Sequence, residues 1–317
     1  MKKVGIIGGS GFIGSYITKA FLNNGFLVKV SAMDIKREDK YQHLVTLDHS
    51  DHLHISELDV MNKTALQDFV FDCDIIIHGG TPFILDFQDA QKQLFDPTIK
   101  GTENFLEVIN KTPGIEKVVF IASVAAWNTN FPMPAGTKNF TDTFDENDTR
   151  FTSTESHPYA QAKFMANQVV EKFIKDNPNL PFEISSVSPV MVLGKSMSDR
   201  EDSTSSVLQY LFKKKIAPDE FIQELYDNDV PFAIVDVEDV ANATFIAANT
   251  IGLHGKDYLL TSETYRISDI SAMLNHQEPK EKASIIYKND LAKKDLGIHF
   301  RPVKETLNNY SNLIEEQ

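Results

Sequence analysis

Up to residue 187 the chain alternates between short apolar runs and longer amphipathic segments. The apolar runs predict β-strands over residues 4–7, 26–32, 54–58, 74–78, 117–122 and 182–187. The amphipathic segments carry apolar residues at helical spacing and predict helices over residues 12–23, 63–70, 97–110 and 158–175. Strands that are apolar throughout and separated by helices are typical of a parallel sheet covered on both faces. The pattern therefore predicts an α/β fold with a doubly wound parallel sheet and ligands at the carboxyl ends of its strands.

The rest of the chain departs from this alternation. Residues 128–156 are rich in Thr, Asp, Asn and Pro and are predicted to form a long surface loop. Beyond Gly194 the alternation ends, except for a short apolar run at 232–235 that is predicted to return to the sheet. We therefore predict a main domain of residues 1–194 plus about 232–256, and a smaller substrate lobe of about 195–231 plus 257–317.

Composition excludes several classes of function. The chain has 317 residues and a net charge of −14, which argues against a nucleic-acid-binding surface. Cys73 is the single cysteine, so an intrachain disulfide is excluded. His43, His49, His52 and His54 crowd one region without the spacing of metal ligands, and we predict no metal site. The N-terminal apolar stretch is too short for a signal peptide or a membrane span, which favours a cytoplasmic protein.

A glycine-rich segment joins the first predicted strand to the first predicted helix. It fits two overlapping glycine spacings, one beginning at Gly8 and one at Gly9. Glycines allow a tight turn and a close backbone approach to a pyrophosphate, and the N–H groups at the start of the helix then face the anion. The segment therefore predicts a dinucleotide site that includes Gly8, Ser10, Gly11, Phe12, Ile13 and Gly14.

The residues after the second predicted strand bear on the choice of dinucleotide. A carboxylate at the strand end would hold the ribose of NAD, but the strand ends at Ala32 and the first acid, Asp34, comes two positions later. Lys36, Arg37 and Lys40 follow and can pair with the 2′-phosphate of NADP. We predict NADP as the cofactor, with Lys36 and Arg37 at the phosphate, and NAD as the open alternative.

Ser123, Tyr159 and Lys163 form the candidate catalytic group. Ser123 follows an apolar strand, and Tyr159 and Lys163 share one face at the start of a helix. A phenol titrates near 10, and a nearby lysine cation is expected to lower that pKa. Tyr159 then donates a proton to a substrate oxygen held by Ser123, while Lys163 bonds the nicotinamide ribose. Tyr210 and Lys214 repeat the spacing, but in a lysine-rich stretch outside the alternation, and are interpreted as a solvated helix face.

Several further segments resemble one enzyme family. Beside the motifs above stand Asp59-Val60 and the stretches 77–83, 96–104, 188–194 and 235–241. Together they resemble the extended short-chain dehydrogenases/reductases of the NAD-dependent epimerase/dehydratase superfamily, and within it the dihydroflavonol-reductase-like carbonyl reductases. The resemblance covers nearly the whole length and implies a Rossmann-type fold.

The resemblance also implies roles for individual residues. It adds cofactor contacts at Asp59, Val60, Gly79, Gly80, Thr81 and Pro189, besides Tyr159 and Lys163, and substrate contacts at Phe83, Ser123, Asn128, Tyr159 and Val190. Two departures stand out. Met33 occupies a position where NADP-dependent relatives usually carry arginine, and Ala122 replaces the first serine of the usual Ser-Ser pair.

The sequence predicts an NADPH-dependent reductase that transfers a hydride to an aldehyde or ketone. The alternative is a sugar-nucleotide epimerase or dehydratase with bound NAD; such relatives usually carry Asn where this chain has Ser188. A second alternative is a regulator that senses the dinucleotide without turnover, although such proteins usually lose the Tyr or the Lys. The predicted partner is a small carbonyl substrate, with no nucleic acid and no membrane, for a monomer or homodimer.

Overall fold

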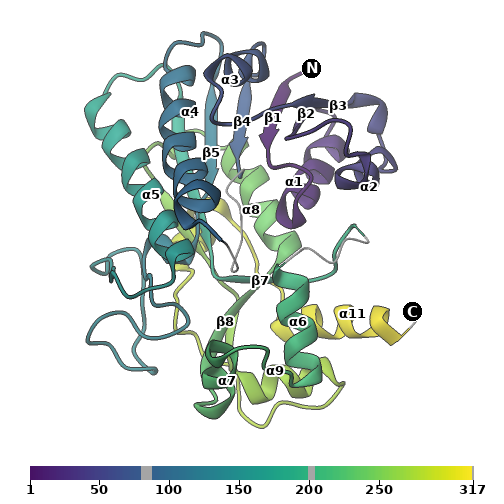
Figure 1. Cartoon of the computed structure of the whole chain (residues 1–317), viewed down its shortest axis with the longest axis vertical. Helices are drawn as coiled ribbons and strands as arrows, with labels where there is room; N and C mark the ends of the chain where they lie inside the picture. Colours follow the sequence, from purple (N-terminus) through teal and green to yellow (C-terminus); the bar gives the residue numbers. More distant parts are fainter. Residues whose placement is uncertain (80–87, 199–203, 316–317) are drawn as a thin grey trace.

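The computed structural model describes residues 1–79, 88–198 and 204–315, and for residues 311–315 the backbone alone. Its centre is a seven-stranded sheet, ordered β3-β2-β1-β4-β5-β6-β9, in which every neighbouring pair is parallel (Figure 1). The strands are β1 (Lys3–Ile7), β2 (Leu27–Ala32), β3 (Leu53–Glu57), β4 (Ile75–His78), β5 (Lys117–Ile121), β6 (Glu183–Pro189) and β9 (Asp257–Leu260). This is the predicted Rossmann-type arrangement.

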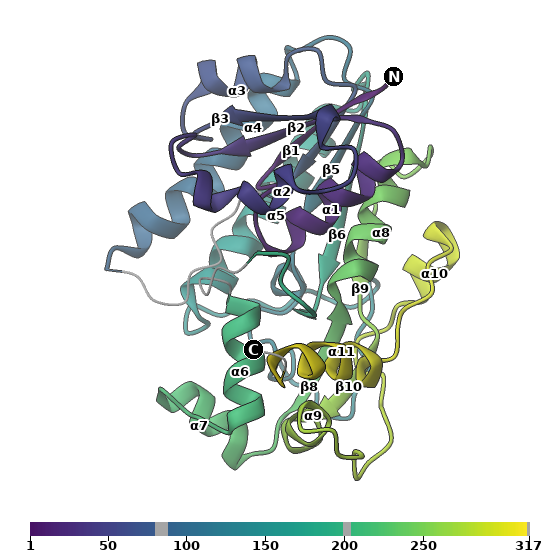
Figure 2. The same ribbon diagram turned by 90° about the vertical axis from the view of Figure 1, so that its right-hand side faces the viewer.

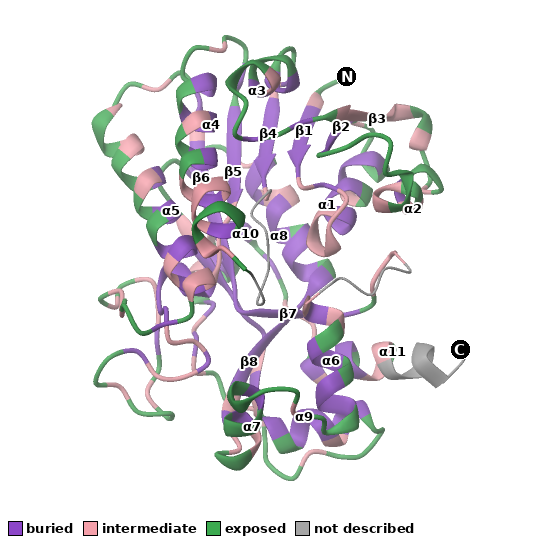
Figure 3. Cartoon of the chain, viewed as in Figure 1, coloured by how far each residue is buried: buried purple, intermediate pink, exposed green. Residues whose placement is uncertain are grey.

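Helices cover both faces of the sheet, as the alternation of apolar strands and amphipathic helices requires. One face packs on α1 (Phe12–Asn23), α8 (Val237–Asn249) and the short α2 (Gln42–Val45). The other packs on α3 (Lys63–Val70), α4 (Gly101–Ile109) and α5 (Pro158–Asp176). Figure 2 shows the sheet between these two layers, and its central strands are buried along most of their length (Figure 3).

A second sheet of three strands, ordered β10-β8-β7, lies at the other end of the molecule (Figure 2). It consists of β10 (Glu263–Arg266), β8 (Pro231–Asp236) and β7 (Met191–Leu193). Its core packs on α6 (Thr204–Lys214), α7 (Glu220–Asp227), α9 (Ile267–Leu274) and α11 (Val303–Glu315), while α10 (Asp290–Leu296) lies against β9.

Two strands lie in a different sheet from the one predicted. The run 232–235 does not return to the main sheet, because β8 pairs with β7 and β10. Residues 257–260, which we assigned to the small lobe, form β9 and pair in parallel with β6. Both runs are short, and several of their partners are distant in sequence, so local pattern does not distinguish the two sheets.

The helix predicted over 97–110 begins earlier than the proline suggested. Gln91–Lys100 forms a π-helical segment, η3, that contains Pro97 and continues directly into α4. A proline inside an α-helix removes one hydrogen bond and crowds the preceding turn, and the wider π geometry accommodates it. This segment packs against α5, the helix that carries Tyr159 and Lys163.

Candidate active site

The glycine turn between β1 and α1 is held in place by the protein's own hydrogen bonds. Gly8 has a φ of +81°, a backbone conformation that residues other than glycine rarely adopt. Its carbonyl accepts the Gly11 N–H at 3.1 Å, and its own N–H donates to Ser31 Oγ at 2.9 Å. The Thr18 hydroxyl donates to the carbonyl of Gly9 at 3.1 Å. The turn therefore has a defined shape before any ligand contact.

Two glycines of this turn differ in whether the fold itself excludes a side chain. A Cβ at Gly14 would lie 2.0 Å from the carbonyl oxygen of Gly8, so the fold itself requires glycine there. A Cβ at Gly11 would meet only that same oxygen, at 3.4 Å, and the φ of −75° suits any residue. Gly11 caps α1 without a side-chain hydrogen bond. The start of α1 thus offers N–H groups at a bare backbone, which fits a pyrophosphate.

Ser10, Phe12 and Ile13 are half-buried beside this turn. Farther along the same sheet edge, the Asp59 carboxylate is exposed and accepts the Met61 N–H at 2.9 Å. The neighbouring Val60 is buried against Gly101. A Cβ added at Gly101 would lie only 2.8 Å from the Cγ2 atom of Val60. The structure therefore places these predicted cofactor residues along one edge of the sheet, at the carboxyl ends of β1 and β3.

The remaining predicted cofactor residues follow β4 and β6. Gly79 donates its N–H to the Ile7 carbonyl at 2.9 Å, directly beside the glycine turn. Pro189 is the buried last residue of β6. Gly80, Thr81 and the predicted substrate residue Phe83 lie outside the described residues.

The basic segment after β2 is already partly neutralised. Lys36 and Arg37 are exposed, and the Arg37 guanidinium forms two hydrogen bonds of 2.8 Å with the Asp39 carboxylate. The Asp34 carboxylate accepts the Lys36 backbone N–H at 2.9 Å. Met33 is 73% exposed, so its side chain stands where an arginine would be accessible to a ligand.

The three predicted catalytic residues come together at the carboxyl end of β5. Ser123 follows that strand, and its Oγ accepts the Ala125 N–H at 3.1 Å, which caps a short 3-10 turn over Val124–Ala126. The Tyr159 hydroxyl is hydrogen-bonded to the Ser123 side chain. One helical turn farther along α5, Lys163 Nζ donates to the Ile121 carbonyl at 3.1 Å. The trio thus spans the end of one strand and the start of one helix.

Capping fixes the start of α5, and with it Tyr159. His157 is the N-cap, and its Nδ1 accepts the Tyr159 backbone N–H at 3.1 Å. Pro158 occupies the first helical position, where its missing N–H is not needed. The Gln161 side chain reaches back to the Ser156 carbonyl at 2.6 Å. These contacts hold the first turn of α5 against the loop that precedes it.

Burial dominates the electrostatics of the trio. It raises the pKa of the Tyr159 hydroxyl above its ordinary value, and the Ser123 hydrogen bond acts in the opposite direction. It lowers the pKa of Lys163 to about 8. The expectation that Lys163 lowers the pKa of the phenol is therefore wrong for this structure. The physical reason is that Lys163 directs its ammonium to the Ile121 carbonyl, while the phenol loses its hydration.

Asn128 and Val190, the other predicted substrate residues, are both buried. Asn128 is fully enclosed, and its amide donates to the Met133 carbonyl and to the Tyr287 hydroxyl, each at 2.8 Å. Its Oδ1 accepts the Asn130 N–H at 3.0 Å. The predicted substrate contact at Asn128 is therefore corrected, because this amide anchors the loop 128–156 and leaves no exposed group.

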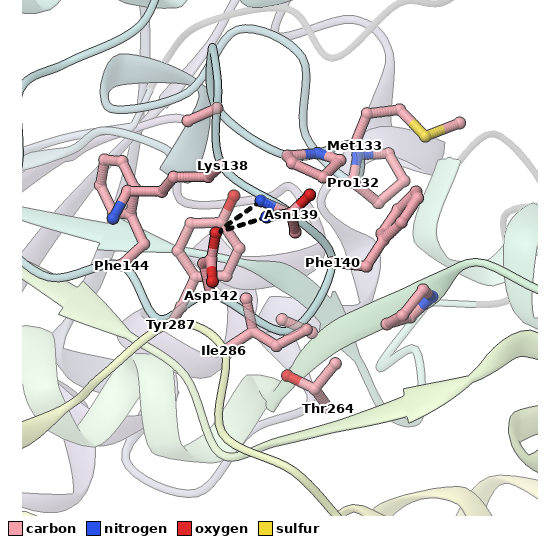
Figure 4. Close-up of a pocket in the computed structure, with 14 residues that line it drawn as sticks. Pro132, Met133, Lys138, Asn139, Phe140, Asp142, Phe144, Thr264, Ile286 and Tyr287 are labelled. Carbon is pink, nitrogen blue, oxygen red and sulfur yellow. Dashed lines mark hydrogen bonds between the residues drawn. The ribbon is translucent and has the colours of Figure 1, made fainter.

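A pocket beside that anchor is too small to take a substrate. It lies between the loop and the second sheet, near Phe140, Ile286 and Tyr287, and Figure 4 shows Asp142 accepting two hydrogen bonds from Asn139 within it. Its volume for water-sized occupants is about 20 Å³. Such a volume holds about one water molecule.

The structure also shows the surroundings of other residues and features that the sequence analysis considered. Tyr210 is 45% exposed and Lys214 is exposed; both lie on α6, a different helix from α5, which carries Tyr159 and Lys163. Within the ranges that the structure describes, no group of His, Cys, Asp or Glu has the arrangement of a metal site. Burial raises the pKa of Cys73 to about 11, which disfavours a reactive thiolate. Among the described helices none is both long and apolar enough to cross a membrane.

The chain is similar in sequence and in fold to known reductases. A cinnamoyl-CoA reductase from Medicago truncatula is 27% identical over 95% of this chain and 93% of its own length. The NADPH-dependent methylglyoxal reductase GRE2 of Saccharomyces cerevisiae is 26% identical over 98% of this chain and 97% of its own. The crystal structure of the yeast Gre2 protein with NADPH superposes with a TM-score of 0.80, at 23% identity, over 99% of this chain and 98% of that one.

The model of one family matches most of the chain. The match runs over residues 4–260, from the first strand through the last strand of the main sheet. These residues include the glycine turn, Ser123, Tyr159 and Lys163. The relatives above are reductases of the kind that the sequence resembles. The chain therefore belongs to the NAD dependent epimerase/dehydratase family.

Proposed function

We propose that this protein is an NADPH-dependent reductase of aldehydes or ketones, with Tyr159 as the proton donor. The observation that carries the proposal is the hydrogen bond between Tyr159 and Ser123, one helical turn from Lys163, at the carboxyl end of β5. The names of the full-length relatives, cinnamoyl-CoA reductase and NADPH-dependent methylglyoxal reductase, support the same reaction class. The substrate is a small molecule with a carbonyl group.

The residues present fit a dinucleotide. The bare turn at Gly11 and the N-terminus of α1 would hold the pyrophosphate, and Lys36 and Arg37 would face the 2′-phosphate. When bound, NADPH supplies the hydride that the carbonyl carbon accepts.

The chain's own residues supply the proton and the orientation. Ser123 Oγ donates a hydrogen bond to the substrate oxygen and places it against the Tyr159 hydroxyl. Tyr159 gives its proton to that oxygen as negative charge develops there, which neutralises the new alkoxide. A raised phenol pKa keeps Tyr159 protonated and ready to donate. Lys163, with a pKa near 8, carries a positive charge at neutral pH and would bond the nicotinamide ribose of bound NADPH.

The preference for NADPH over NADH is expected to be moderate. In the described part of the chain the Lys36 ammonium forms no ion pair, while Arg37 is committed to Asp39. Both groups are exposed, and solvent screens the attraction of exposed pairs. We therefore propose that NADPH is preferred over NADH by a factor of tens rather than thousands.

One buried contact favours reduction over sugar-nucleotide epimerisation. Ser188 is fully enclosed, and its hydroxyl donates to the Asp257 carboxylate at 2.7 Å. This position therefore offers no group to the diphosphate of a nucleotide sugar. A cytoplasmic location and a monomeric or dimeric state remain predictions.

The test is a screen of aldehydes, ketones and UDP-hexoses that follows cofactor absorbance with NADPH and with NADH. We expect oxidation of NADPH with at least one carbonyl compound and none with UDP-hexoses. Tyr159→Phe should lose turnover, and Tyr210→Phe serves as the matched control. Micromolar binding of a UDP-hexose together with its epimerisation would overturn the proposal.

A further inference from the structure

His78 is a buried imidazole at the end of β4 and is not one of the three candidate catalytic residues. The residue is 5% exposed, and its ring packs against two phenyl rings, with centroids 4.6 Å from Phe105 on α4 and 5.1 Å from Phe120 on β5. A phenyl ring would satisfy this apolar surrounding without any polar atom. The imidazole at this position therefore requires a further explanation.

The protonation of the ring is defined by its contacts. Burial first, and then the charge of Lys163, lower the pKa of His78 to about 3, so the ring is neutral at physiological pH. A ring nitrogen hydrogen-bonds to the residue's own backbone, whereas Nε2 is buried with no partner among the described residues. The neutral ring carries a single proton, which this backbone bond assigns to Nδ1. Nε2 is thus a lone-pair acceptor without a donor.

The sheet register brings the backbone of His78 next to the segment of β5 that Lys163 contacts. His78 pairs with Phe120 across β4 and β5, and Lys163 Nζ bonds the carbonyl of Ile121, the next residue along β5. After burial, the positive charge of Lys163 is the second cause that lowers the pKa of His78. An ammonium group has three N–H donors, and the Ile121 carbonyl takes one of them.

We propose that His78 is a positioning residue whose Nε2 accepts a hydrogen bond from the Lys163 ammonium through one bridging water. This inference rests on the proposed function, because it assigns to Lys163 the role described there. The bond orients the ammonium between the strand ends and favours its charged form. The charge of Lys163 affects His78, and among the described residues no carboxylate contributes to the pKa of Lys163 itself.

Two variants separate the acceptor from the packing. His78→Phe keeps an aromatic ring among Phe105 and Phe120 but removes the acceptor, whereas His78→Gln places an amide oxygen near the position of Nε2. We expect His78→Phe to lower kcat by about tenfold at neutral pH, in line with a lost hydrogen bond to a charged group, while KM for the carbonyl changes little. The alkaline limb of the pH profile of kcat should move to lower pH, because the charged form of Lys163 loses a partner. His78→Gln should restore most of both. A native profile in His78→Phe would overturn the proposal.

A spectroscopic test does not depend on turnover, so it remains decisive even if no carbonyl substrate is reduced. In the ¹⁵N spectrum of labelled histidines, His78 Nε2 should appear as an unprotonated nitrogen that accepts a hydrogen bond throughout the neutral range. Lys163→Met should shift that signal, and the exposed His254, whose ring bonds the Ile184 N–H at the opposite end of the sheet, should not respond. A protonated Nε2, or a signal that is the same in Lys163→Met, would refute the role of His78.

Discussion

Alanine substitutions at Gly11 and Gly14 should have different effects on stability but a shared effect on cofactor binding. At Gly14 the new methyl group would lie 2.0 Å from the Gly8 carbonyl oxygen, against an ordinary contact of 3.4 Å or more. The turn would have to retreat by about 1.4 Å, the difference between 3.4 and 2.0 Å. The nearest atoms all belong to the backbone of Gly8 and Gly9, so no flexible side chain can move aside. Overpacking of this kind costs about 1–3 kcal/mol, which exceeds the gain of about 1 kcal/mol that alanine usually brings to a helix.

At Gly11 the folded protein alone gives little reason for a cost. The backbone conformation suits alanine, and the methyl group would meet the Gly8 oxygen at 3.4 Å. We therefore expect a stability within about 1 kcal/mol of native. The methyl group nevertheless covers the bare backbone that a pyrophosphate must approach, so affinity for NADPH should fall at least tenfold, or about 1.4 kcal/mol.

The assay is denaturant unfolding combined with titration of NADPH by fluorescence, with Gly25→Ala as the control. Gly25 has a φ of +76° with nothing within 4 Å, and it lies at the far end of α1. Its substitution should cost about 1 kcal/mol of stability and leave NADPH affinity unchanged. If Gly11→Ala binds NADPH as tightly as the native protein, the glycine turn is not the phosphate site and the reasoning fails.

Three further predictions follow from the same contacts. Tyr159→Phe should abolish turnover and retain NADPH binding, whereas Tyr210→Phe should match the native enzyme; steady-state kinetics and titration measure both. Asp39→Asn should raise the preference for NADPH over NADH several-fold, because it releases the Arg37 guanidinium from its ion pair, and Lys36→Ala should lower that preference. Both effects should shrink in high salt, and the ratio of kcat/KM for the two cofactors measures them. The pKa of His78 is about 3 in the folded protein and near 6.5 in the unfolded chain, so below pH 6.5 unfolding is accompanied by proton binding at His78. Between pH 7 and pH 5 the native protein should therefore lose about 2 kcal/mol more stability than His78→Phe, as measured by urea titrations.

The sequence predicted the elements of the main sheet because their signals are local. Strands buried on both faces are apolar throughout, and the helices beside them carry apolar residues at helical spacing, so the helix over Phe12–Asn23 was located to the residue. The prediction placed residues 232–235 in the main sheet and residues 257–260 in the small lobe. Both placements were wrong, because strand pairing depends on residues distant in sequence. The start of η3 was missed because Pro97 normally marks a helix start, and a π-helical segment is not visible in the periodicity.

The same distinction applies to the candidate site. Ser123, Tyr159 and Lys163 could be grouped from motif and order, and the structure brings them together. The environment of each group could not be predicted, because burial depends on the packing of whole layers. Asn128 is therefore an anchor rather than a substrate contact, the phenol pKa is raised rather than lowered, and His78 gained significance only through its neighbours.

Transfer of label from the cofactor tests the central claim most directly. The protein is incubated with a carbonyl compound that passes the screen and with NADPH deuterated at the transferable position of the nicotinamide. Mass spectrometry of the product and absorbance of the cofactor are then followed together. A net reductase should place one deuterium on the former carbonyl carbon and form NADP⁺ in equal amount. Return of the label to the nicotinamide with no net NADP⁺, as in an epimerase that recycles its dinucleotide, would contradict the account.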